Sequence, residues 1–325
     1  GTVHYDLGGQ IERSERTTPE SSDIHRYLAK MVDRGCRAAV MEVSSHGLAQ
    51  GRTADVAFDV AIFTNLSHDH LDYHGDMPSY FASKRLLFEQ VARGNEKSGA
   101  TAVVNADDSW GRKLVDRFPE GSARLVTYGM GVGCDYRATD MRQGREGIDF
   151  KLEVKGRQLR ARIPLIGRFN VYNSLAALAG GVAMGLNLRE AVANLVSLPQ
   201  VPGRLESVSE GRAFHVFVDY AHTPDALRNA LETLRELDPR RLVLVFGCGG
   251  NRDIPKRAKM GEVASRLADI TVITSDNPRS EDPQKIIEDI ESGFSRDSFE
   301  SVPDRREAIW HAISMLMPGD VLLVA

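Results

Sequence analysis

The chain has 325 residues, of which 42% are hydrophobic and 26% are charged, as in an ordinary globular protein with room for two domains. Its formal net charge of −4 gives no electrostatic reason to expect nucleic acid or an anionic membrane as a partner. No apolar run approaches the roughly 18 residues of a membrane span, so we expect no membrane insertion. The 3 widely spaced cysteines fit neither a disulfide framework nor a zinc site, which favours a reducing cytosol.

The first part of the sequence alternates between helical and buried-strand patterns. Residues 17–20 (TTPE) combine a threonine cap, a proline and a glutamate, which predicts a capping box between Thr17 and Glu20 at the start of a helix. That helix is expected to end at Gly35. The apolar runs 38–43 and 56–64 are typical of parallel strands buried on both faces. Alternation of this kind predicts an α/β domain with ligands beyond the carboxyl ends of its strands.

The loop after the second of these strands alternates histidine and aspartate, a pattern that indicates metal binding. Its members are His68, Asp69, His70, Asp72 and His74. The pattern is close to the HxHxDH loop of metallo-β-lactamase-type hydrolases, but Tyr73 separates Asp72 from His74. A metal-dependent hydrolase that uses His68, His70, Asp72 and His74 therefore stays open as an alternative function. A packing role for the histidines also stays open, and it is favoured for His68 and His74 taken singly.

The segment that follows this loop predicts a helix with Tyr80, Phe81, Leu87 and Phe88 on one buried face. Lys84 occupies the remaining position of that face, where a charged amine is costly to bury. Its amine could reach solvent, pair with a loop aspartate, or react with carbon dioxide to give a carbamate that suits a cation such as Mg²⁺. Spacing alone favours the ion pair. Glu42, on the predicted strand 38–43, lies between apolar neighbours and is therefore a candidate metal ligand.

The rest of the chain continues the α/β pattern, interrupted by one segment in which the period of the hydrophobic residues changes. A strand at 101–105, a helix near 110–118 and a strand near 125 precede residues 136–164, whose period of two predicts a β-meander. Two helices, 174–184 and 188–195, lead to a proline-rich linker at 198–203. Beyond the linker, strands are expected at 215–220, 242–246, 270–274 and 321–324, and helices at 224–237, 256–267, 283–292 and 305–316.

We therefore predict two domains, residues 1–199 and 200–325, the second resembling a doubly wound sheet. The chain begins within a strand-and-turn pattern and ends within an apolar strand. We expect from this that the first domain is truncated at its N-terminus and the second at its C-terminus.

Two loops of the second domain follow predicted strands. Residues 247–253 (GCGGNRD) are glycine-rich, but the GxGxxG and GxxxxGK[ST] spacings of phosphate loops are absent. Residues 274–279 (TSDNPR) have the composition of an ordinary turn, yet the final arginine could clamp a carboxylate or a phosphate.

Taken in order, these segments resemble the Mur ligases, the ATP-dependent enzymes that add amino acids to the peptidoglycan precursor. The resemblance covers nearly the whole chain. It runs through TTPE, EVSSHGLAQGR, TNLSHDHLDYHG, the lysine helix, GRFNVYN, PGRLE, DYAHTPDAL, GCGGNRD and DNPR. It implies a central ATPase-type domain with a mostly parallel sheet and a small meander, followed by a Rossmann-like domain, in the bacterial cytoplasm. DNPR is similar to the motif of the branch that adds meso-diaminopimelate to UDP-N-acetylmuramoyl-L-alanyl-D-glutamate.

The resemblance also implies a role for each matching residue. Mg²⁺ would be bound by Glu42, His70 and a carbamylated Lys84. The UDP-muramoyl dipeptide would contact Thr17, Thr18, Ser44, Gln50 and Arg52. ATP would face Asn170, Asn173, Arg204, Asp219 and His222, and the catalytic set would be Lys84, Arg204 and His222. Diaminopimelate would contact Arg252, Asp276, Asn277, Pro278 and Arg279.

The implied reaction has two steps. ATP phosphorylates the γ-carboxylate of the D-glutamyl residue, and the amine of diaminopimelate then attacks the acyl phosphate and expels phosphate. The family's GxxGKT[ST] loop, its uridine-binding domain and its GKGHE-type segment are not among these residues. Because the glycine-rich loop is the main cradle of the triphosphate, we expect little or no ligase activity from this chain alone. A non-catalytic diaminopimelate-binding module is therefore a further alternative.

Overall fold

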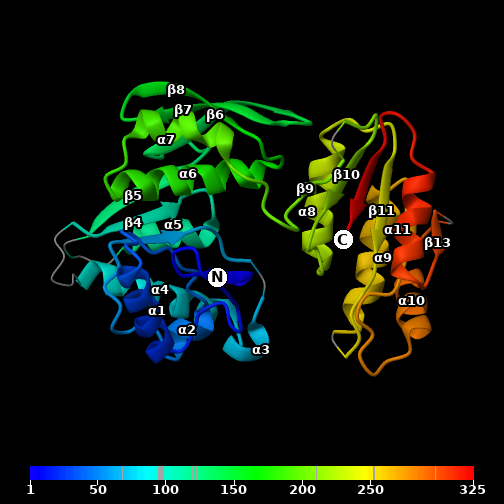
Figure 1. Cartoon of the computed structure of the whole chain (residues 1–325), viewed down its shortest axis with the longest axis horizontal. Helices are drawn as coiled ribbons and strands as arrows, with labels where there is room; N and C mark the ends of the chain where they lie inside the picture. The colour runs from blue at the N-terminus through cyan, green and yellow to red at the C-terminus, as the bar shows by residue number, and fades with distance from the viewer. Residues whose placement is uncertain are drawn as a thin grey trace. The chain divides into compact units, whose positions relative to one another are not determined.

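The computed structural model describes residues 1–67, 69–93, 99–118, 121, 123–209, 211–251, 253–296 and 298–325 (Figure 1). The chain divides into two compact units. The first comprises Gly1–Thr139, Lys151–Leu159 and Tyr172–Val192, and the second comprises Asp140–Phe150, Arg160–Val171 and Ala193–Ala325. The predicted boundary between residues 199 and 200 stays a prediction. None of the helices in the described ranges is both long enough and apolar enough to cross a membrane.

The first sheet has 6 strands in the order β3-β4-β5-β6-β7-β8. They are β3 (Val60–Phe63), β4 (Thr101–Asn105), β5 (Arg124–Gly129), β6 (Tyr136–Gly144), β7 (Gly147–Val154) and β8 (Arg157–Ile163). Strands β3 to β6 pair in parallel, and β4 is buried at every residue, as a continuous apolar run requires. Strands β6 to β8 are sequential neighbours, so the predicted meander is confirmed. The parallel-rich α/β class is confirmed as well.

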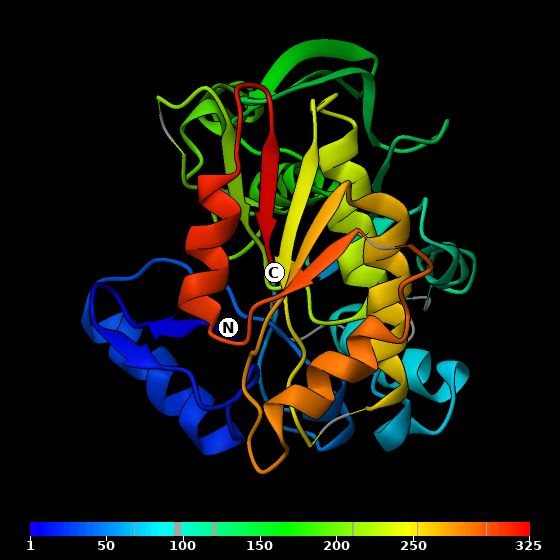
Figure 2. The same cartoon turned by 90° about the vertical axis from the view of Figure 1, so that its right-hand side faces the viewer.

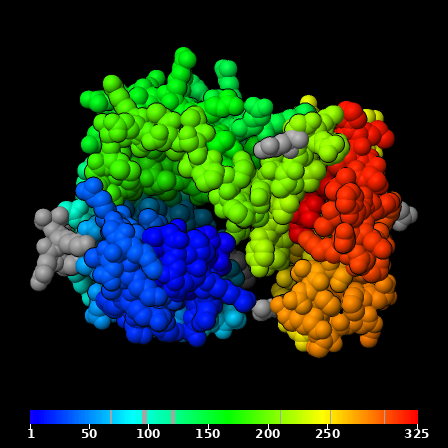
Figure 3. Space-filling view, in the orientation of Figure 1, coloured from blue at the N-terminus to red at the C-terminus, as the bar shows by residue number. Residues whose placement is uncertain are grey.

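Short elements and helices complete this part of the chain. They are the antiparallel pair β1 (His4–Asp6) and β2 (Ile11–Arg13), and the helices α1 (Ser21–Asp33), α2 (Ser45–Ala49), α3 (Leu71–His74), α4 (Met77–Arg93), α5 (Ser109–Asp116), α6 (Arg168–Ala183) and α7 (Leu188–Asn194), with the 3₁₀ turn η1 (Leu195–Ser197). The first hairpin and α1 lie at the surface, in blue (Figure 3). Helix α4 buries its predicted face against β3 and β4, and Phe88 packs on Phe63 at 6.1 Å between ring centroids.

Two local predictions in this part are wrong. Residues 38–43 form no strand, and Val40 is 99% exposed. No strand in the described ranges pairs with this run; it is mostly exposed, so its backbone groups can bond to water instead of to a ladder. The capping box is also absent, because Glu20 forms ion pairs with Arg16 and Arg52 and its side chain caps nothing.

The C-terminal sheet also has 6 strands, in the order β13-β12-β11-β14-β10-β9. They are β9 (Glu206–Ser207), β10 (His215–Val218), β11 (Leu242–Phe246), β12 (Ile270–Ile273), β13 (Phe299–Ser301) and β14 (Val321–Val324), joined by α8 (Pro224–Arg235), α9 (Pro255–Leu267), α10 (Pro283–Glu291) and α11 (Arg305–Ser314). All neighbouring strands are parallel except β9 with β10. The long predicted elements are therefore confirmed, whereas β9 and β13 were too short to predict.

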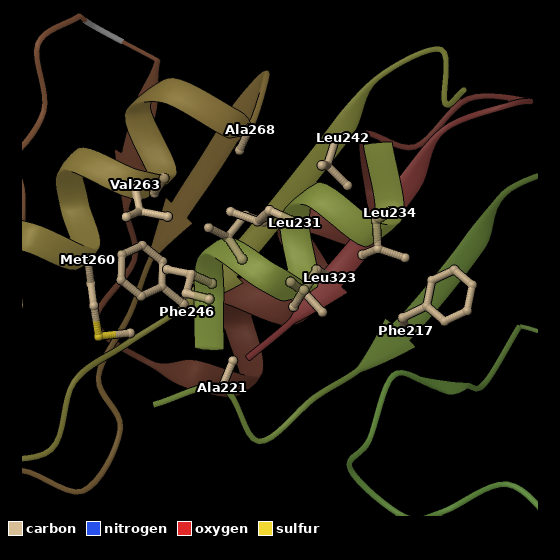
Figure 4. Packing of buried hydrophobic residues seen from close by; sticks show 14 of the residues in the cluster. Phe217, Ala221, Leu231, Leu234, Leu242, Phe246, Met260, Val263, Ala268 and Leu323 are labelled. Carbon is tan, nitrogen blue, oxygen red and sulfur yellow. The ribbon is translucent and has the colours of Figure 1, made fainter. Parts of the chain in front are cut away.

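Helices cover both faces of this sheet. Helices α8, α9 and α10 lie on one face and α11 lies on the other (Figure 2), and alternate side chains of the strands pack against them. Leu231 of α8, Phe246 of β11 and Val263 of α9 lie together in the larger cluster (Figure 4). Because parallel strands share one carboxyl edge, the loops after β10, β11 and β12 all leave the sheet on the same side. That edge carries the second group of candidate site residues.

Candidate active site

The loop after β3 holds His70 in an unusual conformation. The side-chain amide of Asn105, at the end of β4, donates to the carbonyl of Thr64 at 2.8 Å and fixes the start of the loop. His70 has a φ of 55° and precedes the first turn of α3. Its backbone N–H donates to Oδ1 of Asp69 at 2.8 Å, and its Nε2 lies 3.6 Å from Oδ2 of the same carboxylate. A left-handed histidine is uncommon and indicates that its surroundings fix it.

Aromatic rings surround the exposed imidazole of His70. The ring of His46 lies 5.1 Å from His70, 5.4 Å from His74 and 4.2 Å from Tyr73, measured between centroids. His74 stacks on Tyr80 at 5.0 Å. Burial, followed by the neighbouring imidazoles, lowers the pKa of His46 and of His74, which favours the neutral form of both rings.

His74 has hydrogen-bond partners on both ring nitrogens. Its Nε2 lies 2.9 Å from Oγ of Ser45, and its Nδ1 lies 3.4 Å from Oγ of Ser83. His68 lies outside the described residues. Among the described residues, no group of three or more histidines, cysteines, aspartates or glutamates is arranged to hold a metal ion. These residues therefore do not form the ligand set that a zinc-type hydrolase would need.

Glu42 and Lys84 are electrostatic neighbours. Glu42 is exposed, and its Oε2 accepts the backbone N–H and the hydroxyl of Thr2, both at 2.8 Å. Burial lowers the pKa of the half-buried Lys84, and the charge of Glu42 offsets part of that effect. Within the ranges that the structure describes, Nζ of Lys84 has no hydrogen bond or ion pair, and it lies 5.9 Å from the ring centroid of Tyr80. The ion pair with a loop aspartate is therefore not formed.

The residues predicted to contact the dipeptide gather around Thr18. Thr18 is 1% exposed, its hydroxyl donates to the carbonyl of Glu42 at 2.9 Å, and it accepts the N–H of Ser44 at 2.8 Å. Arg52 donates to the carbonyl of Thr18 at 2.9 Å and to the side-chain oxygen of the exposed Gln50. The hydroxyl of Thr17 lies 3.1 Å from that of Thr2. Thr18 is thus an internal support, and Thr17, Ser44, Gln50 and Arg52 surround it.

In the C-terminal unit, three of the predicted ATP-facing residues lie in one group of loops. Oδ2 of Asp219 accepts the N–H of Leu205 at 2.8 Å; burial raises the pKa of Asp219, and this hydrogen bond and Arg204 partly oppose the rise. Nδ1 of His222 lies 3.0 Å from the carbonyl oxygen of Tyr220. Lys256 donates to the carbonyl of His222 at 3.0 Å. Asn170 and Asn173 lie in the first turns of α6, and Asn170 donates to the carbonyl of Ile166 at 2.8 Å.

The glycine-rich loop after β11 is tied to the DNPR loop after β12. The N–H of Gly250 donates to the carbonyl of Asn277 at 2.9 Å, and the guanidinium of Arg279 donates to the carbonyl of Gly250. A Cβ on Gly250 would lie 2.0 Å from the carbonyl oxygen of Pro278, so the contact needs glycine. Asp276 and Arg279 are exposed. Arg252 lies outside the described residues.

Comparison with known families decides the relationship. The model described as the Mur ligase middle domain matches residues 1–181, and the one described as the Mur ligase, glutamate ligase domain matches residues 203–325. The chain belongs to the Mur ligase family.

Individual Mur ligases are similar along the whole chain. The enzymes named UDP-N-acetylmuramoyl-L-alanyl-D-glutamate–2,6-diaminopimelate ligase in Geobacillus kaustophilus (strain HTA426) and Solibacter usitatus (strain Ellin6076) are each 45% identical over 100% of the chain. The chain spans 66% and 65% of their lengths, which is just under two thirds. A solved structure with the same enzyme name matches 98% of the chain with a TM-score of 0.72 and 34% identity, over 65% of its own length.

A folylpolyglutamate synthase of Mycobacterium tuberculosis, solved with ADP, has the same fold. It matches 92% of the chain and 67% of its own length, with a TM-score of 0.72 and 22% identity.

Sequence reasoning missed several residues that support the loops of this member of the Mur ligase family. They are Thr2, Lys256, Arg257 and Glu281. A signal existed for one of them, because Arg257 shares a helical stripe with the buried residues Met260 and Ala264. The others become visible only through partners far away in the sequence.

Proposed function

We propose that the whole protein adds meso-diaminopimelate to UDP-N-acetylmuramoyl-L-alanyl-D-glutamate with ATP, in bacterial peptidoglycan precursor synthesis in the cytoplasm. The observation that carries the proposal is the pair of tied loops, 247–251 and 276–279, at the carboxyl edge of a parallel sheet. Ligands of open α/β sheets bind at such edges. Relatives that are 45% identical throughout this chain bear the name of that ligase.

We assign the acceptor pocket, which would bind the incoming meso-diaminopimelate, to the DNPR loop. Arg279 uses one guanidinium N–H on Gly250, and its exposed side chain retains donors for a carboxylate. Diaminopimelate carries a second carboxylate that lysine lacks, so this arginine gives a physical basis for choosing between them. Asp276, Asn277 and Pro278 complete the described part of the proposed pocket, and Arg252 is proposed to join them.

We assign the binding of Mg²⁺ to Glu42, His70 and Lys84. Mg²⁺ takes oxygen ligands, and Glu42 offers Oε1, which has no hydrogen bond in the described part of the chain. A lysine ammonium would repel the ion, so a fit requires that Lys84 lose its charge. The burial-lowered pKa of Lys84 supports this change. When bound, Mg²⁺ would neutralise charge on the phosphoryl oxygens.

The proposed modification of Lys84 is a carbamate. The lone pair of the neutral amine forms a C–N bond to carbon dioxide, one C=O π bond breaks to give the carboxylate, and the amine proton goes to water. The product is a carboxylate at a position where the side chain has no ion pair among the described residues. Glu42 and the carbamate would then present oxygens of the kind that Mg²⁺ prefers.

The other predicted residues receive their roles from the same scheme. We assign Thr17, Ser44, Gln50 and Arg52 to the dipeptide, with Thr18 as their support. We assign Arg204, Asp219 and His222, together with Asn170 and Asn173, to ATP. Arg204 is suited to the charge that builds up on the transferred phosphoryl group, which leaves ATP for the D-glutamyl carboxylate. The amine of diaminopimelate then displaces phosphate from that carbonyl.

A coupled phosphate-release assay on the whole protein tests the function. We expect phosphate only when ATP, Mg²⁺, the UDP-muramoyl dipeptide and meso-diaminopimelate are all present, and much less with L-lysine. Equal turnover with lysine, or release without the dipeptide, would contradict the proposal. The 325-residue chain alone should show little turnover. Calorimetric binding of meso-diaminopimelate by this chain without nucleotide binding would support the non-catalytic alternative for it.

A further inference from the structure

The largest fully buried side chain among the described residues is an arginine, Arg257, which is 1% exposed. It lies in the first turn of α9. Burial of a guanidinium is costly unless carboxylates pair with it. Nη1 of Arg257 donates to Oδ2 of Asp289 and Nη2 donates to Oε1 of Glu281, both at 2.9 Å. The hydrogen bonds to Glu281 and Asp289 raise the pKa of Arg257. The charge is therefore permanent and paired.

The same guanidinium connects the two loops of the proposed acceptor pocket. Oε1 of Glu281 accepts the N–H of Asn251 as well as Nη2 of Arg257. Nη2 also lies 3.5 Å from the carbonyl oxygen of Gly249. On the other side, Oδ1 of Asn251 accepts the hydroxyl of Ser280 at 3.0 Å. One buried cation thus holds the glycine-rich loop after β11 and the end of the DNPR loop in a single network.

This network surrounds two strained residues. Asn251 has a φ of 53° and Arg279 a φ of 52°, values that residues other than glycine seldom adopt. Such conformations persist where neighbouring groups over-determine them, often at ligand sites. The guanidinium of Arg279 is held on the carbonyl of Gly250, next to the atoms that Arg257 fixes.

We propose that Arg257 is a positioning residue of the acceptor pocket. It fixes residues 247–251 against residues 276–281 so that Arg279 is already oriented when a carboxylate of the incoming diamino acid arrives. The inference rests on the proposed function for the identity of that ligand. A clamp that is held in place before binding loses less conformational entropy when the ligand binds.

The chain offers a matched control for a purely structural role. Arg241 also pairs with a buried carboxylate, because its Nε donates to Oδ1 and Oδ2 of Asp320 at 3.2 and 3.1 Å and Asp320 is 0% exposed. Its Nη2 donates to the carbonyl of Met315 at 2.8 Å. Arg241 directly precedes β11, at the amino edge of the sheet, whereas the two loops leave the carboxyl edge.

The experiment compares Arg257→Met, Arg257→Lys and Arg241→Met in the whole protein. For each variant, KM for meso-diaminopimelate, KM for ATP, kcat and the unfolding temperature are measured. Arg257→Met should raise KM for diaminopimelate by about 10- to 100-fold, as expected for a misplaced binding group. Its KM for ATP should change less than about twofold. Arg257→Lys should recover part of the loss, because lysine keeps the charge but not the planar fork. Arg241→Met should lower the unfolding temperature and leave both KM values near wild type.

Two results would overturn the inference. One is an equal rise of both KM values in Arg257→Met, and the other is a rise of KM for diaminopimelate in Arg241→Met as large as that in Arg257→Met. If Arg257→Met does not fold, Arg257→Lys and Glu281→Gln take its place with the same required split between the two KM values.

The proposed function can be wrong while the positioning role of Arg257 is right. The sign of this would be wild-type protein that does not use diaminopimelate as a substrate. Hydrogen exchange then tests the positioning role without turnover. Protection of residues 247–251 and 276–281 should fall in Arg257→Lys and stay unchanged in Arg241→Met. Unchanged protection in both variants would contradict the role.

Discussion

Two helices of this protein each carry a cation on a buried face, and the two cations have opposite surroundings. Lys84 of α4 has no ion pair among the described residues, and burial lowers its pKa. Arg257 of α9 pairs with Glu281 and Asp289, and these hydrogen bonds raise its pKa. Lysine can lose its proton and become a nucleophile, whereas arginine cannot. The comparison teaches that a half-buried lysine with no ion pair among the described residues is suited to reaction, while a buried arginine paired with carboxylates is suited to holding loops in place.

The largest expected effect is on the lysine side. Lys84→Ala in the whole protein should lower kcat/KM by about 10²- to 10³-fold, the usual cost of removing one group that stabilises transition-state charge. Added formate, a small carboxylate, should restore part of the activity. Near-normal turnover of Lys84→Ala would contradict the proposal that Lys84 takes part in the reaction while Arg257 only supports the loops.

A smaller loss is expected where the Arg257 network meets the ligand. Arg279→Ala should raise KM for meso-diaminopimelate by about 10- to 100-fold, since a charge-assisted hydrogen bond contributes about 1.5–3 kcal/mol. It should also reduce the preference for diaminopimelate over lysine, measured as the ratio of the two kcat/KM values. If that ratio stays at the wild-type value, the assignment of the DNPR loop is wrong.

Lys84 and Arg257 should also differ in what they do to stability. Because the fold lowers the pKa of Lys84, its charged form is disfavoured in the native state below that pKa. In buffer free of carbon dioxide, where Lys84 stays an amine, Lys84→Met should therefore raise the free energy of unfolding at pH 7, by an amount of the order of 1 kcal/mol. The gain should shrink as the pH rises toward the ordinary lysine value of 10.5. Urea unfolding at neutral and alkaline pH measures both parts, and a loss of stability in Lys84→Met would contradict the account.

The smallest effect is expected for Glu281, one of the two carboxylate partners of Arg257, at acidic pH. Hydrogen bonds from Arg257 and from the N–H of Asn251 lower the pKa of Glu281. Its contribution to stability is thus complete above the ordinary value of 4.5 and is lost as the pH falls through the lowered pKa. Glu281→Gln should unfold at a lower temperature than wild type near neutral pH, and the gap should narrow in acid. A difference in unfolding temperature that grows as the pH falls would contradict this prediction.

The fold of the C-terminal unit was largely predictable from local pattern. Strand β11 and helix α9 lie within one residue of their predicted bounds, because buried runs and capped helices alternate there without interruption. Residues 38–43 have the same apolar pattern, yet they form no strand in the described structure. Periodicity reports how a segment could be buried, but a strand also needs a neighbour that supplies hydrogen bonds.

The candidate site was predictable only where one residue carried the signal. Lys84 was identified because it interrupts an apolar stripe, although its expected ion pair is absent. Arg257 interrupts a similar stripe, but it stands beside Pro255 and Lys256 in the first turn of α9, so its neighbours in the sequence do not mark it as buried. Its partners lie 24 and 32 residues away in the sequence, a separation that no local spacing rule can connect.

The chemical state of Lys84 is the central claim, and carbon NMR tests it most directly. The 325-residue chain is incubated with ¹³C-labelled bicarbonate and Mg²⁺, and its spectrum is compared with that of Lys84→Arg. The account predicts a protein-bound carbamate signal in the wild-type chain that is absent from the variant. A wild-type spectrum with no such signal, or a signal that persists in Lys84→Arg, would contradict it.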